Sequence, residues 1–222
     1  MDLSLRDRLR AAFRWTDPGP DSRHLVSDRS GWWRDAALLA ALGPALADLF
    51  RAEAPSVVVA PEVTGFLLGP LVARSLSVGF VEGLRHGVRR PIAEAMTWAD
   101  VAADHRGEPQ RLGVRSRLIS PADRVLVVDD WVATGAQARA LFAVITALGA
   151  TPIGTATVVA DCPDAVRAEL HVRSILTGAD LPPTGSSPGS IPPIPAPQGC
   201  GIALAASTGQ RELVIGSYAC GS

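Results

Sequence analysis

The segment "RVLVVDDWVATGAQARALF", residues 124–142, decides the fold class of this chain. Its apolar run at 125–128 predicts a buried strand over 124–128, and the spacing of residues 134–148 predicts a helix that ends at Gly149. Two adjacent aspartates and a Thr-Gly pair lie between the two elements. A strand, a short corner and a helix in this order form the repeating unit of an α/β fold.

The rest of the chain repeats this alternation. Short apolar, β-branched runs predict further strands at 56–61, 78–85, 151–161 and 171–177. Helical spacing predicts helices at 3–13, 64–77 and 164–170, and one long helix that starts near Ser30 and ends before Pro55. We therefore expect the α/β class, with a mostly parallel central sheet flanked by helices.

Composition divides the chain into three parts. Residues 1–29 are predicted to be an N-terminal extension, 30–178 the main domain and 179–222 a low-complexity tail. The tail contains "LPPTGSSPGSIPPIPAPQG", which is too rich in Pro, Gly and Ser to pack, so we expect it to be disordered. Residues 92–115 lack a clean period and are expected to be a long surface loop with some strand, in the role of a lid.

The bulk composition excludes several classes of protein. The net charge is −1, so it gives no argument for nucleic-acid binding. All 21 basic residues are arginine, which leaves arginine, histidine and backbone N–H groups to bind any phosphate. The three cysteines are far apart, no apolar run is long enough to span a membrane, and the charged N-terminus is unlike a signal peptide. We expect a soluble cytoplasmic protein.

The corner after residue 128 has the chemistry of an anion site. A helix that follows such a corner presents free N–H groups and the positive end of its dipole. Thr134 can cap the helix or bond a phosphate oxygen, and Gly135 lets the backbone approach closely. Asp129 and Asp130 would repel a phosphate, so they need hydroxyl or metal partners instead. A sugar phosphate with Mg²⁺ offers both.

The motif "VLVVDDWVATGAQ" resembles the phosphoribosyl-diphosphate (PRPP) binding motif of type I phosphoribosyltransferases. Upstream, "VVVAPEVTGFLLGPLVARSLSVGFVEGLRHGVRRP" resembles the corresponding segment of adenine phosphoribosyltransferases, and "ELHVRSIL" resembles their closing strand. The resemblance covers most of residues 50–177 in the order of that family. It implies an Mg²⁺-dependent enzyme, expected to be a homodimer, that converts PRPP and a nucleobase, with adenine favoured, to a nucleoside monophosphate and pyrophosphate.

The resemblance also implies roles for individual residues. The carboxylates of Asp129 and Asp130 would hold the ribose hydroxyls, close to Mg²⁺, and would count with Arg85 as catalytic residues. The 5-phosphate would bind to Ala133, Thr134, Gly135, Ala136 and Gln137. The pyrophosphate would face a loop that in this family often has a non-proline cis peptide, together with a basic turn: Pro61, Glu62, Val63, Thr64, Arg85, His86 and Arg89. Trp131 and Val132 would lie beside the base.

Other interpretations fit the sequence less well. A receiver domain needs a lysine and a longer domain after Asp130, and a dinucleotide-binding fold needs a GxGxxG motif. The sequence has Thr64 where the family usually has arginine, and His86 where it usually has lysine. These differences favour a runner-up, a non-catalytic PRPP-sensing regulator. A third possibility is a related enzyme for xanthine, hypoxanthine or orotate.

Overall fold

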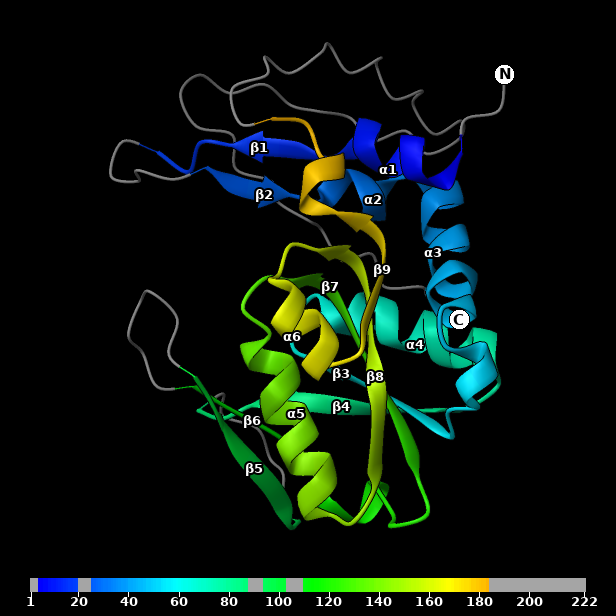
Figure 1. Ribbon diagram of the computed structural model, residues 1–222, viewed down its shortest axis with the longest axis vertical. Helices are drawn as coiled ribbons and strands as arrows, with labels where there is room; N and C mark the ends of the chain where they lie inside the picture. Colours follow the sequence, from blue (N-terminus) through cyan, green and yellow to red (C-terminus); the bar gives the residue numbers. More distant parts are fainter. Residues whose placement is uncertain (1–3, 20–24, 88–93, 103–109, 184–222) are drawn as a thin grey trace, which may run out of the picture. The chain divides into compact units, whose positions relative to one another are not determined.

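A central sheet organises the part of the chain that the computed structural model describes, residues 4–19, 25–87, 94–102 and 110–183. Within these ranges seven strands follow the order β5-β6-β4-β3-β7-β8-β9 (Figure 1). They span Val57–Pro61 (β3), Gly79–Arg85 (β4), Met96–Val101 (β5), Gln110–Arg115 (β6), Arg124–Val132 (β7), Thr151–Ala160 (β8) and Val172–Thr177 (β9). The five strands from β4 to β9 in this order are parallel, and β6 pairs antiparallel with both of its neighbours, β4 and β5. The predicted class is confirmed.

Alternating side chains of the central strands supply two separate cores. In β3, Val58 and Ala60 join one apolar cluster, whereas Val57 and Val59 join the other. The same alternation holds in β7. Successive side chains of a strand point to opposite faces, so a strand buried on both faces must be apolar throughout. This is why 57–61 and 125–128 are continuous apolar runs.

Helices cover both faces of the sheet. Helices α3 (Ala36–Asp48) and α4 (Gly65–Leu76) pack on one face, and α5 (Ala136–Ala147) packs on the other. The remaining helical elements are α1 (Leu5–Ala12), α2 (Ser30–Arg34), α6 (Asp164–Glu169) and the 3₁₀ turns Arg51–Glu53, Ser116–Leu118 and Gly178–Asp180. Among the described residues, no helix combines the length and apolar character that crossing a membrane requires.

The long helix predicted from Ser30 is interrupted at Asp35. The backbone of Asp35 is extended (φ −83°, ψ 109°), and its carboxylate accepts the N–H groups of Ala37 and Leu38 at 2.9 and 3.0 Å. Aspartate is a strong N-cap residue because it satisfies donors that the first turn leaves free. The single-helix prediction was therefore wrong: Asp35 ends α2 and starts α3.

Residues 94–102 and 110–115 form more strand than the predicted surface loop allowed. β5 and β6 pair along their full length, from Met96 opposite Arg115 to Val101 opposite Gln110. β6 also pairs with β4, where Leu112 lies opposite Arg85. The Trp98 ring lies so close to Gly113 that a β-carbon there would come within 2.4 Å of it. The middle of the predicted lid, residues 103–109, lies outside the described residues, so the lid role stays a prediction.

The N-terminal extension packs on the main domain through aromatic residues. After α1, the strands β1 (Arg14–Thr16) and β2 (Val26–Asp28) form an antiparallel hairpin that the sequence did not predict. Phe13 is buried, with ring centroids 6.0 Å from those of both Trp32 and Trp131. Trp32 is fully buried, and its indole N–H donates to the carbonyl of Leu9 at 2.8 Å. Trp32 therefore packs against helix α1.

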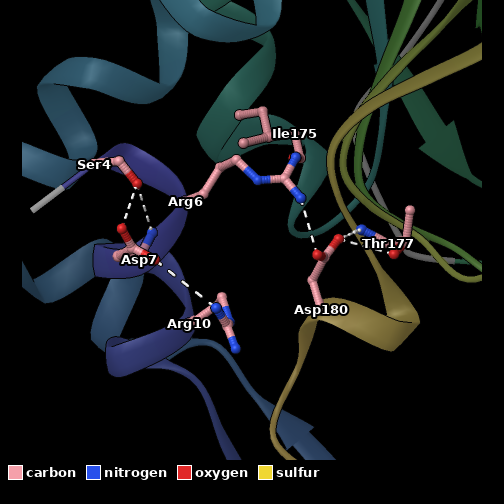
Figure 2. Close-up of polar contacts among 7 residues, drawn as sticks. All are labelled: Ser4, Arg6, Asp7, Arg10, Ile175, Thr177 and Asp180. Carbon is pink, nitrogen blue, oxygen red and sulfur yellow. Dashed lines mark hydrogen bonds and ion pairs between the residues drawn. The ribbon is translucent and has the colours of Figure 1, made fainter.

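The residues just after β9 are tied to the same N-terminal segment (Figure 2). Arg6 donates to the carbonyl of Ile175 and to the carboxylate of Asp180, which also accepts the backbone N–H and the hydroxyl of Thr177. Leu181 is 7% exposed, and the carbonyl of Pro182 accepts the Trp15 indole N–H at 2.8 Å. Asp180, Leu181 and Pro182, which the sequence-based boundary assigns to the tail, therefore contact the N-terminal segment or are buried, and the boundary itself stays a prediction.

These contacts predict that residues 178–183 stabilise the fold. A chain ending at Thr177 should melt roughly 5–10 °C below one ending at Pro183, because burial of Leu181 contributes about 1.5–3 kcal/mol and the polar contacts add to it. Thermal unfolding of the two chains, with Leu181→Ala in the longer one as a control, measures the difference. Equal melting temperatures would place the boundary at Gly178 after all.

Candidate active site

The carboxyl ends of three neighbouring parallel strands, β4, β3 and β7, meet at one edge of the sheet, which is where ligands bind in open α/β folds. A cavity of about 530 Å³ lies there. Its lining comes from the N-terminal segment, the ends of these strands, the adjoining ends of β5 and β6, and the start of α5: Ser27, Arg29, Glu62, Thr64, Arg85, Val101, Ala102, Gln110 and residues 129–138. Most of the residues predicted for the site are thus brought together.

The acid pair is built into β7, which continues to Val132 and does not end at 128 as predicted. Asp129 and Asp130 are 7% and 3% exposed. The backbone N–H of Asp130 donates to the Asp129 carboxylate at 2.9 Å, and Arg29 forms an ion pair with the Asp130 carboxylate. Burial, followed by the neighbouring negative charge of Asp130, raises the pKa of Asp129 well above its ordinary value. The two carboxylates are therefore held where a neutral hydroxyl or a cation would relieve their repulsion.

The loop between β7 and α5, residues 133–137, is the segment predicted to bind the 5-phosphate, and it is called the cradle below. Helix α5 starts at Ala136, two residues later than predicted, and its N-cap is Gly135 with φ +74°. The Thr134 hydroxyl accepts the N–H of Ala136 at 3.3 Å. A β-carbon at Gly135 would lie 2.7 Å from both Leu170 and Val166, so this position needs glycine for its space as well as for its backbone angle.

Arg139 fastens this cradle from outside the cavity. Its guanidinium donates to the carbonyl of Thr134 at 2.8 Å and forms two bonds of 2.7 Å to the carboxylate of Glu169 on α6. The hydrogen bonds between these two side chains are the main reason why the pKa of Arg139 is raised and the pKa of Glu169 is lowered. The chain thus holds the loop conformation before any anion arrives.

The predicted pyrophosphate side is only partly assembled at the cavity. The Glu62-Val63 peptide bond is cis, and Glu62 and Thr64 line the cavity. Pro61 is buried in β3 and Val63 is 68% exposed, and neither is among the lining residues. His86 also lies off the cavity, with its ring edge-on to Trp98 at 5.1 Å.

Arg85 is the cationic residue of this side that lines the cavity. Its guanidinium donates to the Glu62 carbonyl at 3.0 Å, to the Gln110 side chain at 3.1 Å and to the Gln137 side chain at 3.4 Å. Its backbone N–H donates to the Glu62 carboxylate. Arg89, the remaining predicted residue, lies outside the described residues.

Trp131 and Val132 both line the cavity, as expected for residues beside a base. Val132 is buried in the core that contains α5. Trp131 packs against Phe13 and meets Trp15 edge-on at 6.2 Å, so it joins the N-terminal segment to the cavity. The role of either residue in base binding stays a prediction.

Sequence reasoning missed six lining residues: Ser27, Arg29, Val101, Ala102, Gln110 and Ala138. Arg29 follows the β2 strand and reaches residue Asp130, 101 positions later in the chain. A signal existed, because a buried acid pair in a chain without lysine needs an arginine nearby. Nothing in the sequence says which of 21 arginines supplies it.

A parallel sheet with a phosphate cradle and an acid pair at the end of its central strand defines a type I phosphoribosyltransferase. No protein-family model matches the chain. An adenine phosphoribosyltransferase of Methylococcus capsulatus is 33% identical over 153 residues, 69% of this chain and 86% of that protein. One from Maricaulis maris is 36% identical over 114 residues, 61% of its length. This chain belongs to the adenine phosphoribosyltransferase family.

Solved structures agree on the fold. The crystal structure of adenine phosphoribosyltransferase from Thermoanaerobacter pseudethanolicus superposes with a TM-score of 0.68 at 21% identity, covering 78% of this chain and 99% of that one. The Trypanosoma brucei enzyme, crystallised with AMP, pyrophosphate and ribose-5-phosphate, gives 0.65 at 19% identity, covering 82% and 83%. At these identities the likeness concerns the fold alone.

The buried acid pair predicts a pH-dependent stability. The pKa of Asp129 is raised in the folded state, whereas the aspartates of the unfolded chain titrate at about pH 3.9. Between these two pKa values the native protein therefore binds more protons than the unfolded chain. The free energy of unfolding should therefore fall as pH rises from the unfolded value through the folded pKa. Asp129→Asn should weaken this decline and raise the melting temperature at neutral pH, measured without Mg²⁺. A variant with the wild-type pH profile would contradict the assignment.

The cradle predicts a second outcome. Gly135→Ala should weaken PRPP binding by about tenfold or more, since the loop must shift to accommodate the methyl group and thereby loses its bonds to a charged phosphate. Gly149→Ala is the matched control, because Gly149 has φ +81° but its nearest neighbour, Pro121, is 3.4 Å away. It should cost about 1 kcal/mol of stability and leave PRPP affinity unchanged. Calorimetric titration separates the two variants, and equal effects would refute the cradle.

Proposed function

We propose that this protein transfers the phosphoribosyl group of PRPP to adenine and releases AMP and pyrophosphate. The observation that carries the proposal is the one cavity in which the acid pair, the phosphate cradle and Arg85 meet. Its family membership supports the same activity, since the relatives are named as adenine phosphoribosyltransferases. The sensor alternative gains no support from these enzyme relatives.

The cavity offers a distinct environment to each part of PRPP. The 5-phosphate fits the loop 133–137, where α5 presents its first N–H groups. The ribose 2- and 3-hydroxyls can donate to Asp129 and Asp130, which relieves a buried pair of negative charges. The pyrophosphate then extends toward Arg85, with Glu62 and Thr64 at the loop after β3.

The reaction breaks the bond between the anomeric carbon and a pyrophosphate oxygen and forms a bond from that carbon to a ring nitrogen of the base. The ribose ring becomes oxocarbenium-like as the bond breaks, and negative charge builds on the leaving group. The protein contributes position and charge stabilisation and forms no covalent bond to the substrate. Arg85, a described residue that lines the cavity, would balance the growing charge.

The donor set also fits Mg²⁺. Within the described ranges no cluster of three or more acidic, histidine or cysteine side chains could hold a metal alone. Mg²⁺ is ordinarily bound by one or two carboxylates together with substrate phosphates, and Asp129 and Asp130 can supply the carboxylates. When bound, the ion would neutralise charge on the pyrophosphate. Mg²⁺ dependence is part of the proposal, as are the cytoplasmic location and the homodimer expected from the sequence.

A scan of nucleobases tests the substrate. With PRPP and Mg²⁺, adenine should give the fastest release of pyrophosphate. Xanthine belongs in the scan, because a xanthine phosphoribosyltransferase of Oenococcus oeni is 29% identical over 125 residues. Hypoxanthine, guanine and orotate complete it. Faster turnover of another base would show that this base is the substrate. Tight PRPP binding without turnover of any base would instead favour the non-catalytic PRPP-sensing regulator.

Removing the cation that faces the leaving group should affect the chemical step most. Arg85→Ala should lower kcat by about 100-fold or more, with a smaller rise in the KM for PRPP, because charge develops on pyrophosphate only as its bond breaks. Arg117→Ala removes an exposed arginine that pairs with Glu94 and serves as the control. Initial rates at varied PRPP measure both constants. An equal loss in the two variants would show that Arg85 has no special role.

A further inference from the structure

The partners of the Arg85 guanidinium differ from those of the other arginines around the cavity and its cradle. Its three side-chain bonds go to neutral oxygens: one backbone carbonyl and two side-chain amides. By contrast, Arg29 and Arg139 are paired with carboxylates. A neutral acceptor fixes the direction of a guanidinium without cancelling its charge, whereas a carboxylate does both.

Strand register explains how Gln110 reaches Arg85. β6 runs antiparallel to β4 with Leu112 opposite Arg85, so the first residue of β6 lies beyond the carboxyl end of β4. The bond from the His86 N–H to the Arg111 carbonyl extends this pairing. Gln110 therefore stands at the cavity, on the same side of its strand as Leu112.

The second amide comes from a different element, helix α5. Gln137 lies in the first turn of α5, in the loop predicted to bind the 5-phosphate, yet its side-chain oxygen accepts from Arg85. Arg85 thus spans from the start of β6 to the start of α5, with the Glu62 carbonyl as its third anchor. Its orientation depends on three segments that are far apart in the sequence.

We propose that Gln110 and Gln137 are positioning residues that aim the Arg85 guanidinium at the leaving group and preserve its full charge. This inference rests on the proposed function, because it assigns the leaving group to Arg85. Neither glutamine touches the reacting atoms. Each acts on the leaving group through Arg85, so its effect on pyrophosphate binding must disappear when Arg85 is removed.

A double-mutant cycle tests this dependence directly. Gln110→Leu keeps the approximate size of the side chain and removes the acceptor. It should weaken the binding of inorganic pyrophosphate by about tenfold in the wild-type background, as expected for a hydrogen bond to a charged group, and by less than about twofold in the Arg85→Ala background. Calorimetry supplies the affinities and thermal unfolding confirms that each variant folds. Equal losses in both backgrounds, or no loss in the first, would overturn the proposal.

The charge part of the proposal needs a second variant. Gln110→Glu can still reach Arg85 but places a carboxylate on it, so it should bind pyrophosphate and turn over more weakly than Gln110→Leu while melting no lower than wild type. Ala102→Glu puts a carboxylate elsewhere in the cavity lining and measures the general effect of negative charge there. A Gln110→Glu variant with wild-type kcat and pyrophosphate affinity, or one no weaker than Ala102→Glu, would contradict the need for a neutral acceptor.

Failure of this inference is distinguishable from failure of the proposed function. A wild-type protein that binds pyrophosphate and shows the expected cycle, but forms no nucleotide from any base, would contradict only the enzymatic activity. A protein that forms AMP and shows no coupling between Gln110 and Arg85 would contradict only the positioning role. A wild-type protein that binds no pyrophosphate would overturn both.

Discussion

Two carboxylates buried side by side at the end of the central strand constrain the rest of this structure. Asp129 and Asp130 cannot stay in a poorly hydrated site without partners, and repulsion between them adds to burial in raising the pKa of Asp129. Arg29 supplies the partner for Asp130, and it comes from the N-terminal segment. That segment must therefore dock beside the sheet edge, where aromatic packing between Phe13 and Trp131 holds it.

The same constraint explains why the site is shared among distant segments. The sheet brings the ends of β3, β4 and β7 together, and each supplies a different group to the cavity. Glu62 follows β3, Arg85 ends β4, and the acid pair lies in β7. Contacts between the segments set their relative positions. Arg139 and Glu169 hold the cradle from behind, and Arg85 joins the cradle to β6. An anion would therefore meet groups that are already oriented, which lowers the cost of binding.

Local patterns made much of the fold predictable. Continuous apolar runs identified the strands buried on both faces, and the spacing of Asp129, Asp130, Thr134 and Gly135 was enough to identify the corner that holds the site. The features that the sequence did not predict depend on contacts within the folded chain. The β5–β6 pair has no strong period of its own and forms by pairing with β4, Asp35 breaks a continuous helical pattern by capping, and Gln110 and Arg29 reach the cavity through tertiary packing.

The central claim is that the acid pair binds the ribose of PRPP, and calorimetric titration of PRPP with Mg²⁺ tests it most directly. The wild-type protein is compared with the double variant Asp129→Asn and Asp130→Asn, which removes both charges and keeps the shapes. The account predicts a Kd at least about tenfold weaker in the variant, because each lost charged hydrogen bond costs about 1.5–3 kcal/mol. An unchanged Kd in a folded variant would contradict it.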